Sequence, residues 1–122
     1  MREIKFRARD RESGEWRYHE DSGYDFWYGL DDGQYDSETL SQYTGLKDKN
    51  GKEIYEGDIV QGNFGIPPIG VRSVVEYEGS AFIIKTPKCN PKEVTLRTGI
   101  ECLDLHIIGN IYENPELLKE QP

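Results

Sequence analysis

The chain has 122 residues, of which 35% are hydrophobic and 31% charged, and its net charge at pH 7 is −8. This length suits one domain of about 100–150 residues with a small core. The acidic balance argues against nucleic-acid binding, which requires clustered lysine and arginine. No apolar run approaches the roughly 18 residues that span a bilayer, and the N-terminus lacks the apolar centre of a signal peptide. We therefore expect a cytoplasmic protein.

The first 18 residues predict a β-hairpin. Residues 2–9 alternate, with Ile4, Phe6 and Ala8 on one side, which is typical of a half-buried strand. Residues 10–14 form a polar turn, after which Trp16 and Tyr18 resume the alternation. We expect Trp16 to pack in the core opposite Phe6.

The next segment is both acidic and aromatic. Between Tyr18 and Leu46 lie seven of the 23 acidic residues and no lysine or arginine, and half of the aromatic residues lie between Tyr18 and Tyr43. Its glycines disfavour a long helix. We expect a short strand at about 24–28, a loop around 31–33, and Leu40 packed against the core. The simplest role for the rings is to fill the core beside the hairpin.

Residues 43–60 contain the most regular turn signal of the chain. Asn50-Gly51 is the dipeptide preferred where both central residues of a two-residue turn need a positive φ. A second break follows at 56–58, and Ile59-Val60 then opens a β-branched run. A short strand, a turn, a short strand and a corner are typical of the start of a small antiparallel barrel.

The rest of the chain continues this pattern. Residues 62–70 predict an apolar loop, and a hairpin follows with strands at 71–77 and 81–86. Further short strands are expected around Val94 and Leu96 and within 103–112, and Asn114-Pro115 predicts a helix start.

The expected fold is mainly β and antiparallel, in a single domain over residues 1–122. No strand run is followed by a helix long enough for a parallel crossover. The parts are an N-terminal hairpin with its acidic-aromatic extension (1–42), a barrel (43–112), and a C-terminal helical turn and tail (113–122).

The common catalytic spacings are absent from the sequence. It contains no phosphate-binding glycine loop, dinucleotide fingerprint, nucleophile elbow or paired-histidine zinc motif. His19 and His106 are the only histidines, and we expect His106 to be a strand residue with a satisfied hydrogen bond. Cys89, Cys102 and His106 lack the paired close spacings of a structural zinc site. In a reducing cell we expect two free thiols, one or both partly buried.

Two classes of function stay open for the acidic-aromatic segment. The first is a non-catalytic interaction module, because tyrosine and tryptophan dominate interface energetics and carboxylates steer a basic partner. Its expected surface consists of Tyr24, Trp27, Tyr28, Asp31, Asp32, Tyr35 and Asp36. One variant of this idea is mimicry of nucleic-acid charge.

The second class is a metal-assisted hydrolase that uses Asp31, Asp32 or Asp36, although this run does not match a calcium loop and a solvated acidic loop explains it better. We predict no catalytic residue, cofactor or metal, and no membrane or direct nucleic-acid binding. We expect a protein partner, and a homo-oligomer formed through the apolar loop 62–70.

Three separated stretches carry a family resemblance: MREIKFRARD at 1–10, YTGLKDKNGKEIYEGDIV at 43–60 and IIGNIYENPELL at 107–118. Together they resemble the YopX family of small phage and prophage proteins. The resemblance implies an SH3-like barrel, a location in the bacterial host cytoplasm and an uncharacterised activity. It supplies no catalytic residues to transfer.

Overall fold

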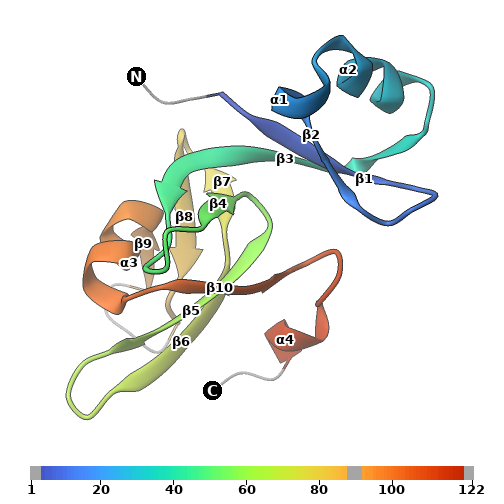
Figure 1. The fold of residues 1–122 in the computed structure, drawn as a ribbon. Coiled ribbons are helices and arrows are strands. Elements are labelled where there is room, and N and C mark those ends of the chain that lie inside the picture. The colour runs from blue at the N-terminus through green and yellow to red at the C-terminus, as the bar shows by residue number, and fades with distance from the viewer. Residues whose placement is uncertain (1–3, 88–91, 120–122) are drawn as a thin grey trace. The chain divides into compact units, whose positions relative to one another are not determined.

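The computed structural model describes residues 4–87 and 92–119. The chain divides into two compact units, residues 1–45 and 46–122 (Figure 1). This division lies close to the border expected between the N-terminal extension and the barrel. Whether the two units behave as a single domain stays a prediction.

The first unit begins with the predicted hairpin, which is confirmed. Strand β1 (Phe6–Asp10) pairs antiparallel with β2 (Trp16–Tyr18). The position expected for Trp16 was wrong, because Trp16 stands opposite Arg9 in the register and not opposite Phe6. The guanidinium of Arg7 lies 4.2 Å from the Trp16 ring centroid, a cation–π arrangement that explains how an arginine is buried here.

The strand expected at 24–28 was also wrong, because this segment is helical. A short helix α1 (His19–Ser22) leads into α2 (Tyr24–Asp31). Phe26, Gly29 and Leu30 recur at helical spacing and form the inner face of α2. A Cβ on Gly29 would lie 2.5 Å from the Tyr35 ring, so glycine is required for that ring to pack under the helix. Gly33, at φ +84°, forms the expected turn after α2.

Strand β3 (Tyr35–Lys47) starts well before the predicted hairpin and pairs with β1. The pairing contains a bulge, since Arg7 faces Ser41 but Arg9 faces Asp36. The Thr39 hydroxyl closes the bulge by donating to the Asp36 carbonyl (2.6 Å) and accepting from the Arg9 amide (2.9 Å). The expectation that Leu40 packs against the core was wrong, because its side chain is exposed at the bulge.

The second unit opens with the turn between β3 and β4 (Glu53–Tyr55). Asp48 is buried and organises this turn: one oxygen accepts from the amides of Asn50 and Lys52, and the other accepts from the amide of Ile107, each at 2.9 Å. Gly51 has φ +82°, but among the described residues only Ser80 and Asp104 combine a side chain with a positive φ. The expected positive φ at Asn50 was therefore wrong.

The second unit also contains two three-stranded antiparallel sheets. The first has the order β10-β5-β6, with β5 at Asp58–Phe64, β6 at Ile69–Val74 and β10 at His106–Asn110. The second has the order β7-β8-β9, with β7 at Glu76–Glu78, β8 at Ala81–Lys85 and β9 at Glu93–Thr95. The predicted break at 56–58 and a hairpin turn around 78–81 are both present. Gly79 and Ser80 supply the two positive φ values of this turn.

The single strand expected at 71–77 was wrong, because residues 71–74 belong to β6 and pair with β5, and only β7 pairs with β8. The loop expected at 62–70 is shorter than predicted, because β5 continues to Phe64 and β6 begins at Ile69.

Two helices follow β9. Helix α3 (Leu96–Leu103) replaces the strand expected through Leu96, and Thr95 caps its start by accepting from the Thr98 amide. The missed signal is the spacing of Leu96, Gly99 and Leu103, which lie on one helical face and are buried. The C-terminal helical turn, α4 (Glu116–Lys119), is confirmed.

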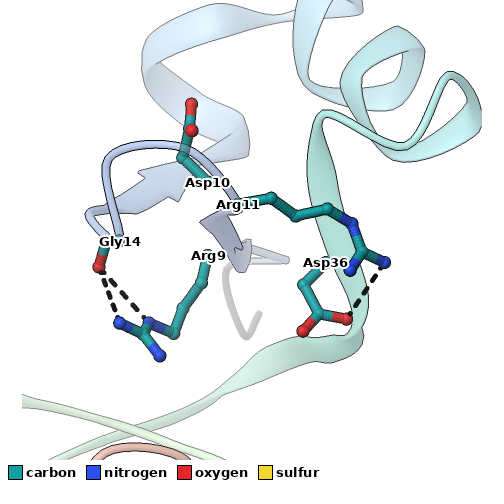
Figure 2. Close-up of a pocket in the computed structure, with 5 residues that line it drawn as sticks. All are labelled: Arg9, Asp10, Arg11, Gly14 and Asp36. Atoms are coloured by element: carbon teal, nitrogen blue, oxygen red, sulfur yellow. Dashed lines mark hydrogen bonds and ion pairs between the residues drawn. The ribbon is translucent and has the colours of Figure 1, made fainter.

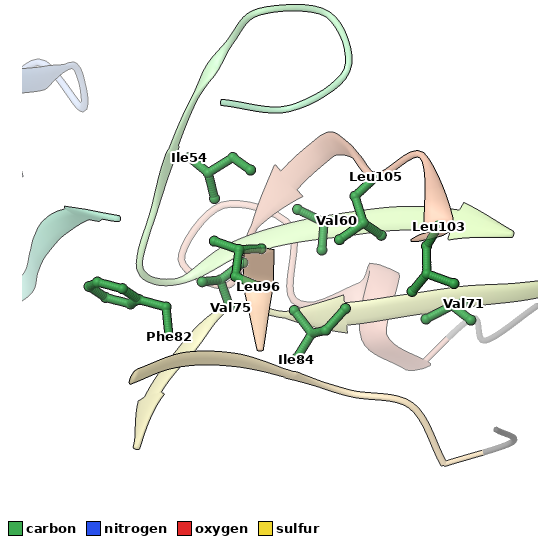
Figure 3. Close-up of a cluster of buried hydrophobic side chains, with 9 residues drawn as sticks. All are labelled: Ile54, Val60, Val71, Val75, Phe82, Ile84, Leu96, Leu103 and Leu105. Carbon is green, nitrogen blue, oxygen red and sulfur yellow. The ribbon is translucent and has the colours of Figure 1, made fainter. Parts of the chain in front are cut away.

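The core of the second unit is mainly aliphatic (Figure 3). Among the described residues its nine buried members come from β4, β5, β6, β8 and α3, from the link between β6 and β7, and from the loop before β10: Ile54, Val60, Val71, Val75, Phe82, Ile84, Leu96, Leu103 and Leu105. The predicted fold class is confirmed: the protein is mainly antiparallel β, with a curled half-barrel and a short C-terminal helix.

Candidate functional site

The outer face of α2 carries most of the surface expected from the sequence. Tyr24, Trp27, Tyr28 and Asp31 follow the i, i+3, i+4, i+7 spacing that places them on one side of a helix. Tyr24 is 83% exposed, Tyr28 66% and Trp27 41%. We call these four residues the α2 face. These four residues lie on the side of α2 opposite Phe26 and Gly29, which are buried. The three rings of the α2 face therefore point toward solvent.

Trp27 is held in place at its base. Its ring centroid lies 5.6 Å from that of Phe6, 5.1 Å from that of Phe26 and 5.3 Å from that of His19. The first two contacts are edge-to-face, the arrangement that aromatic pairs prefer. A partner that covers the open part of Trp27 would therefore meet a ring whose position is already fixed, which lowers the entropic cost of binding.

The charge around the α2 face is negative. Asp31 belongs to the face, and Asp25 and Asp32 are exposed next to it. Asp32 follows the last helical residue, and its carboxylate accepts from the Gln34 amide at 3.0 Å. Glu20 is exposed on α1 and pairs with Lys5 at 3.4 Å. Carboxylates around exposed rings favour a partner that presents lysine or arginine.

Two of the residues predicted for this surface do not belong to it. Tyr35 is only 7% exposed, and its ring centroid lies 5.7 Å from that of Phe26 in the core of the first unit. Asp36 lies on β3, where one carboxylate oxygen accepts from the Glu38 amide and contacts the Arg11 guanidinium. The prediction placed all seven residues in one segment, but the turn after α2 sends Tyr35 and Asp36 into a strand.

Asp36 instead lines a polar cavity of about 230 Å³ together with Arg9, Asp10, Arg11 and Gly14 (Figure 2). Arg9 donates from two of its nitrogens to the Gly14 carbonyl, at 3.3 and 3.1 Å, and Arg11 lies 3.5 Å from Asp36. The sequence predicted only a polar turn at residues 10–14. The signal it missed is the i, i+2 spacing of the two arginines, which predicts one strand face.

The Asp10 carboxylate is the structural centre of this hairpin. It accepts from the amides of Ser13 and Glu12 and lies 3.6 Å from the Arg17 guanidinium. The Ser13 hydrogen bond, with those of Glu12 and Gln34 and the charge of Arg17, holds the pKa of Asp10 below its ordinary value although burial opposes this. In Figure 2 its carboxylate points away from Arg9 and Arg11, so Asp10 orders the turn and does not neutralise the cavity.

The residues considered for metal binding are not gathered. Within residues 4–87 and 92–119, no group of three or more histidine, cysteine or acidic side chains is placed to hold a metal ion. Cys89 lies outside the described residues, and Cys102 is exposed as a free thiol. His106 lies in β10 as expected, but its buried Nδ1 has no hydrogen-bond partner among the described residues, so the satisfied bond we expected is missing.

The structure therefore defines a class: a mainly antiparallel β protein whose first unit presents an aromatic, acidic helix face. The family comparison is more specific. The YopX protein family matches residues 5–119, which is nearly the whole chain, and the chain belongs to that family. A search of the curated proteins finds no match. In the described part of the chain, no helix is long and apolar enough to cross a membrane.

Proposed function

We propose that this YopX-family chain is a phage or prophage accessory protein that acts as a non-catalytic interaction module. In this proposal the α2 face docks a basic segment of another protein in the cytoplasm of the bacterial host. The observation that carries the proposal is the exposure of three large rings on one side of one short helix, beside carboxylates and no lysine or arginine of the same segment.

The composition of the α2 face fits this role. Tyrosine and tryptophan are enriched among the residues that dominate binding energy, because they bury a large area at a small cost in side-chain entropy. A ring that is half-buried in its own unit, as Trp27 is, is ordered before the partner arrives. Arginine or lysine in the partner would contact both the ring faces and the carboxylates.

The most direct test is affinity capture from a bacterial host that carries the phage, read by mass spectrometry. We expect the wild-type chain to retain a partner that the Trp27→Ala, Tyr28→Ala double variant loses. Tyr77→Ala is the matched control, because Tyr77 is a 52% exposed aromatic residue in the other unit. Identical partner lists for the wild type and the double variant would contradict the proposal.

The salt dependence of capture separates two forms of the proposal. If the carboxylates replace nucleic-acid phosphates on a basic host protein, the captured protein should be lost steeply as salt rises and should be displaced by DNA or RNA. If the rings contribute most of the affinity, capture should persist at high salt. If neither salt nor nucleic acid changes the capture, the mimicry of nucleic-acid charge is contradicted, but the interaction module is not.

The alternative, a metal-assisted hydrolase, has no comparable observation in its favour. Asp31 lies on the α2 face, Asp32 contacts the Gln34 amide, and Asp36 faces Arg11 across the polar cavity. Calorimetry with magnesium, calcium, manganese and zinc tests it directly. Heat of binding that disappears in Asp31→Asn or Asp32→Asn would favour the hydrolase over the interaction module.

A further inference from the structure

The second unit contains an apolar groove of about 320 Å³ that the proposed function does not use. It is lined by Leu46, Ala81, Phe82, Thr95, Leu96 and Arg97. Phe82 and Leu96 belong to the core, so the groove is an opening into it. At the rim, Thr95 and Arg97 are exposed. Among the described residues, no hydrogen bond or ion pair engages the Arg97 guanidinium.

The same unit also presents an apolar tip that has no cover. The hairpin of β5 and β6 pairs Phe64 with Ile69 at its end. Phe64 is 39% exposed, Ile69 40% and Ile66, in the turn between them, 101%. Residues 59–71 include no charged side chain. We call residues 64–69 the finger. In a sequence of which 31% of the residues are charged, an exposed apolar tip without charge is a candidate contact site.

The finger and the groove lie at opposite ends of the second unit. Val71, near the finger, is at one end of the core in Figure 3, whereas Phe82, in the groove, is at the other end. Val71 pairs with Gly62 in the hairpin that carries the finger, whereas Phe82 pairs with Tyr77 in the other sheet. A finger cannot therefore reach the groove of its own chain.

We propose that the finger of one copy inserts into the groove of a second copy. Ile66 would fill the space above Phe82 and Leu96. The finger turn contains Pro67 and Pro68, which have carbonyl acceptors but no amide donors. Arg97 at the groove rim supplies donors for those carbonyls. This inference does not depend on the α2 face or on its partner.

The geometry of this contact makes a specific assembly. Because finger and groove are different surfaces, the contact is heterologous, and it produces a ring or a chain unless each of two copies inserts into the other. The three apolar side chains bury little area compared with a permanent interface. We therefore expect self-association that depends on protein concentration and resists high salt, because it contains no ion pair.

Sedimentation equilibrium of the full chain over a wide concentration range tests the proposal. The wild type should show an average mass that rises with concentration. Ile66→Asp disables the finger and Ala81→Arg disables the groove, and each variant alone should remain at the monomer mass. Ile4→Asp, which changes a 67% exposed residue of the first unit, should associate like the wild type.

Mixing the two disabled variants gives the sharpest readout. One chain keeps a working groove and the other a working finger, so an equimolar mixture should form a heterodimer at twice the monomer mass. Unchanged melting temperatures would show that both variants are folded. The proposal is overturned if the wild type is monomeric throughout, if either variant associates like the wild type, or if the folded variants fail to form the heterodimer.

Discussion

The two units of this chain bury different kinds of side chain. Among the described residues, the main buried cluster of the second unit has nine members, eight of them aliphatic, whereas that of the first unit consists of Ala8, Phe26 and Tyr35. The first unit has more aromatic rings than its small core can bury, so several rings lie partly or wholly at its surface. A small core that depends on ring contacts both exposes a binding surface and has less apolar burial to stabilise it.

The largest effect is expected when the central side chain of the smaller core is removed. Phe26 is fully buried and contacts the rings of Trp27, Tyr35 and His19. We expect Phe26→Ala to lower the free energy of unfolding of the first unit by about 3–5 kcal/mol. Hydrogen exchange should show lost amide protection in β1 and β3 while β5 and β6 stay protected.

Ile84→Ala is the reciprocal control, since Ile84 is fully buried in the second unit. It should cost about 2–5 kcal/mol and expose the amides of β5 and β6 first. Equal loss of amide protection in both units after either substitution would show that the two units unfold together. It would contradict the idea that each unit is stabilised by its own core.

A buried carboxylate gives the next largest effect, in the second unit. Asp48 accepts three backbone hydrogen bonds, two within its turn and one from Ile107 on β10. Asp48→Ala leaves these amides without acceptors, so we expect a loss of about 3 kcal/mol, measured by urea denaturation. Asp32→Ala is the matched control, because Asp32 is exposed and accepts from one local amide; a change within about 0.5 kcal/mol is expected.

Gly29→Ala tests the close packing of the first unit. Alanine favours a helix over glycine by about 1 kcal/mol, but its Cβ would overlap the buried Tyr35 ring. Overpacking costs about 1–3 kcal/mol, so we expect a net loss of about 1 kcal/mol by urea denaturation. An increase in stability would mean that the Tyr35 ring moves aside easily and that the small core is loosely packed.

Features fixed by local chemistry were predicted from the sequence, and features set by distant contacts were not. The turn at 48–51 depends on Asp48 and Gly51, the turn at 78–81 depends on Gly79 and Ser80, and both turns were located correctly. The bulge in β3 depends on Thr39 meeting Arg9, 30 residues away. No local pattern contains that contact, so the strand before residue 43 was missed.

The candidate site shows the same limit. The acidic-aromatic segment was recognisable by composition, but its division into an outer and an inner face depends on helical geometry. Tyr, Trp and Phe favour strands when considered one by one, so the i, i+3, i+4 spacing of the rings was overlooked. The burial of Tyr35 depends on the missing side chain of Gly29, which the sequence shows only after the helix is known.

Acidic pH should lower the stability of the first unit through Asp10. Its folded-state pKa lies below the ordinary 3.8, so it stabilises the folded state above pH 3.8, and that stabilisation is lost as pH falls through the folded-state pKa. We expect β1 amide protection to decrease at acidic pH. In Asp10→Asn this decrease should become smaller, whereas the β5 and β6 amides should respond to acid as in the wild type.

The smallest effect on stability is expected at the α2 face. Tyr24 and Tyr28 project from α2 with most of their surface in solvent, unlike Phe26 on the inner side. Replacing both by alanine should change the free energy of unfolding by no more than about 0.5 kcal/mol, while binding of a synthetic arginine-rich peptide should weaken by about tenfold or more. Tyr77→Ala should leave peptide binding unchanged. If the Tyr24→Ala, Tyr28→Ala variant instead loses stability and keeps its affinity, the rings act in packing, and the exposed aromatic helix is only the outer layer of an undersized core.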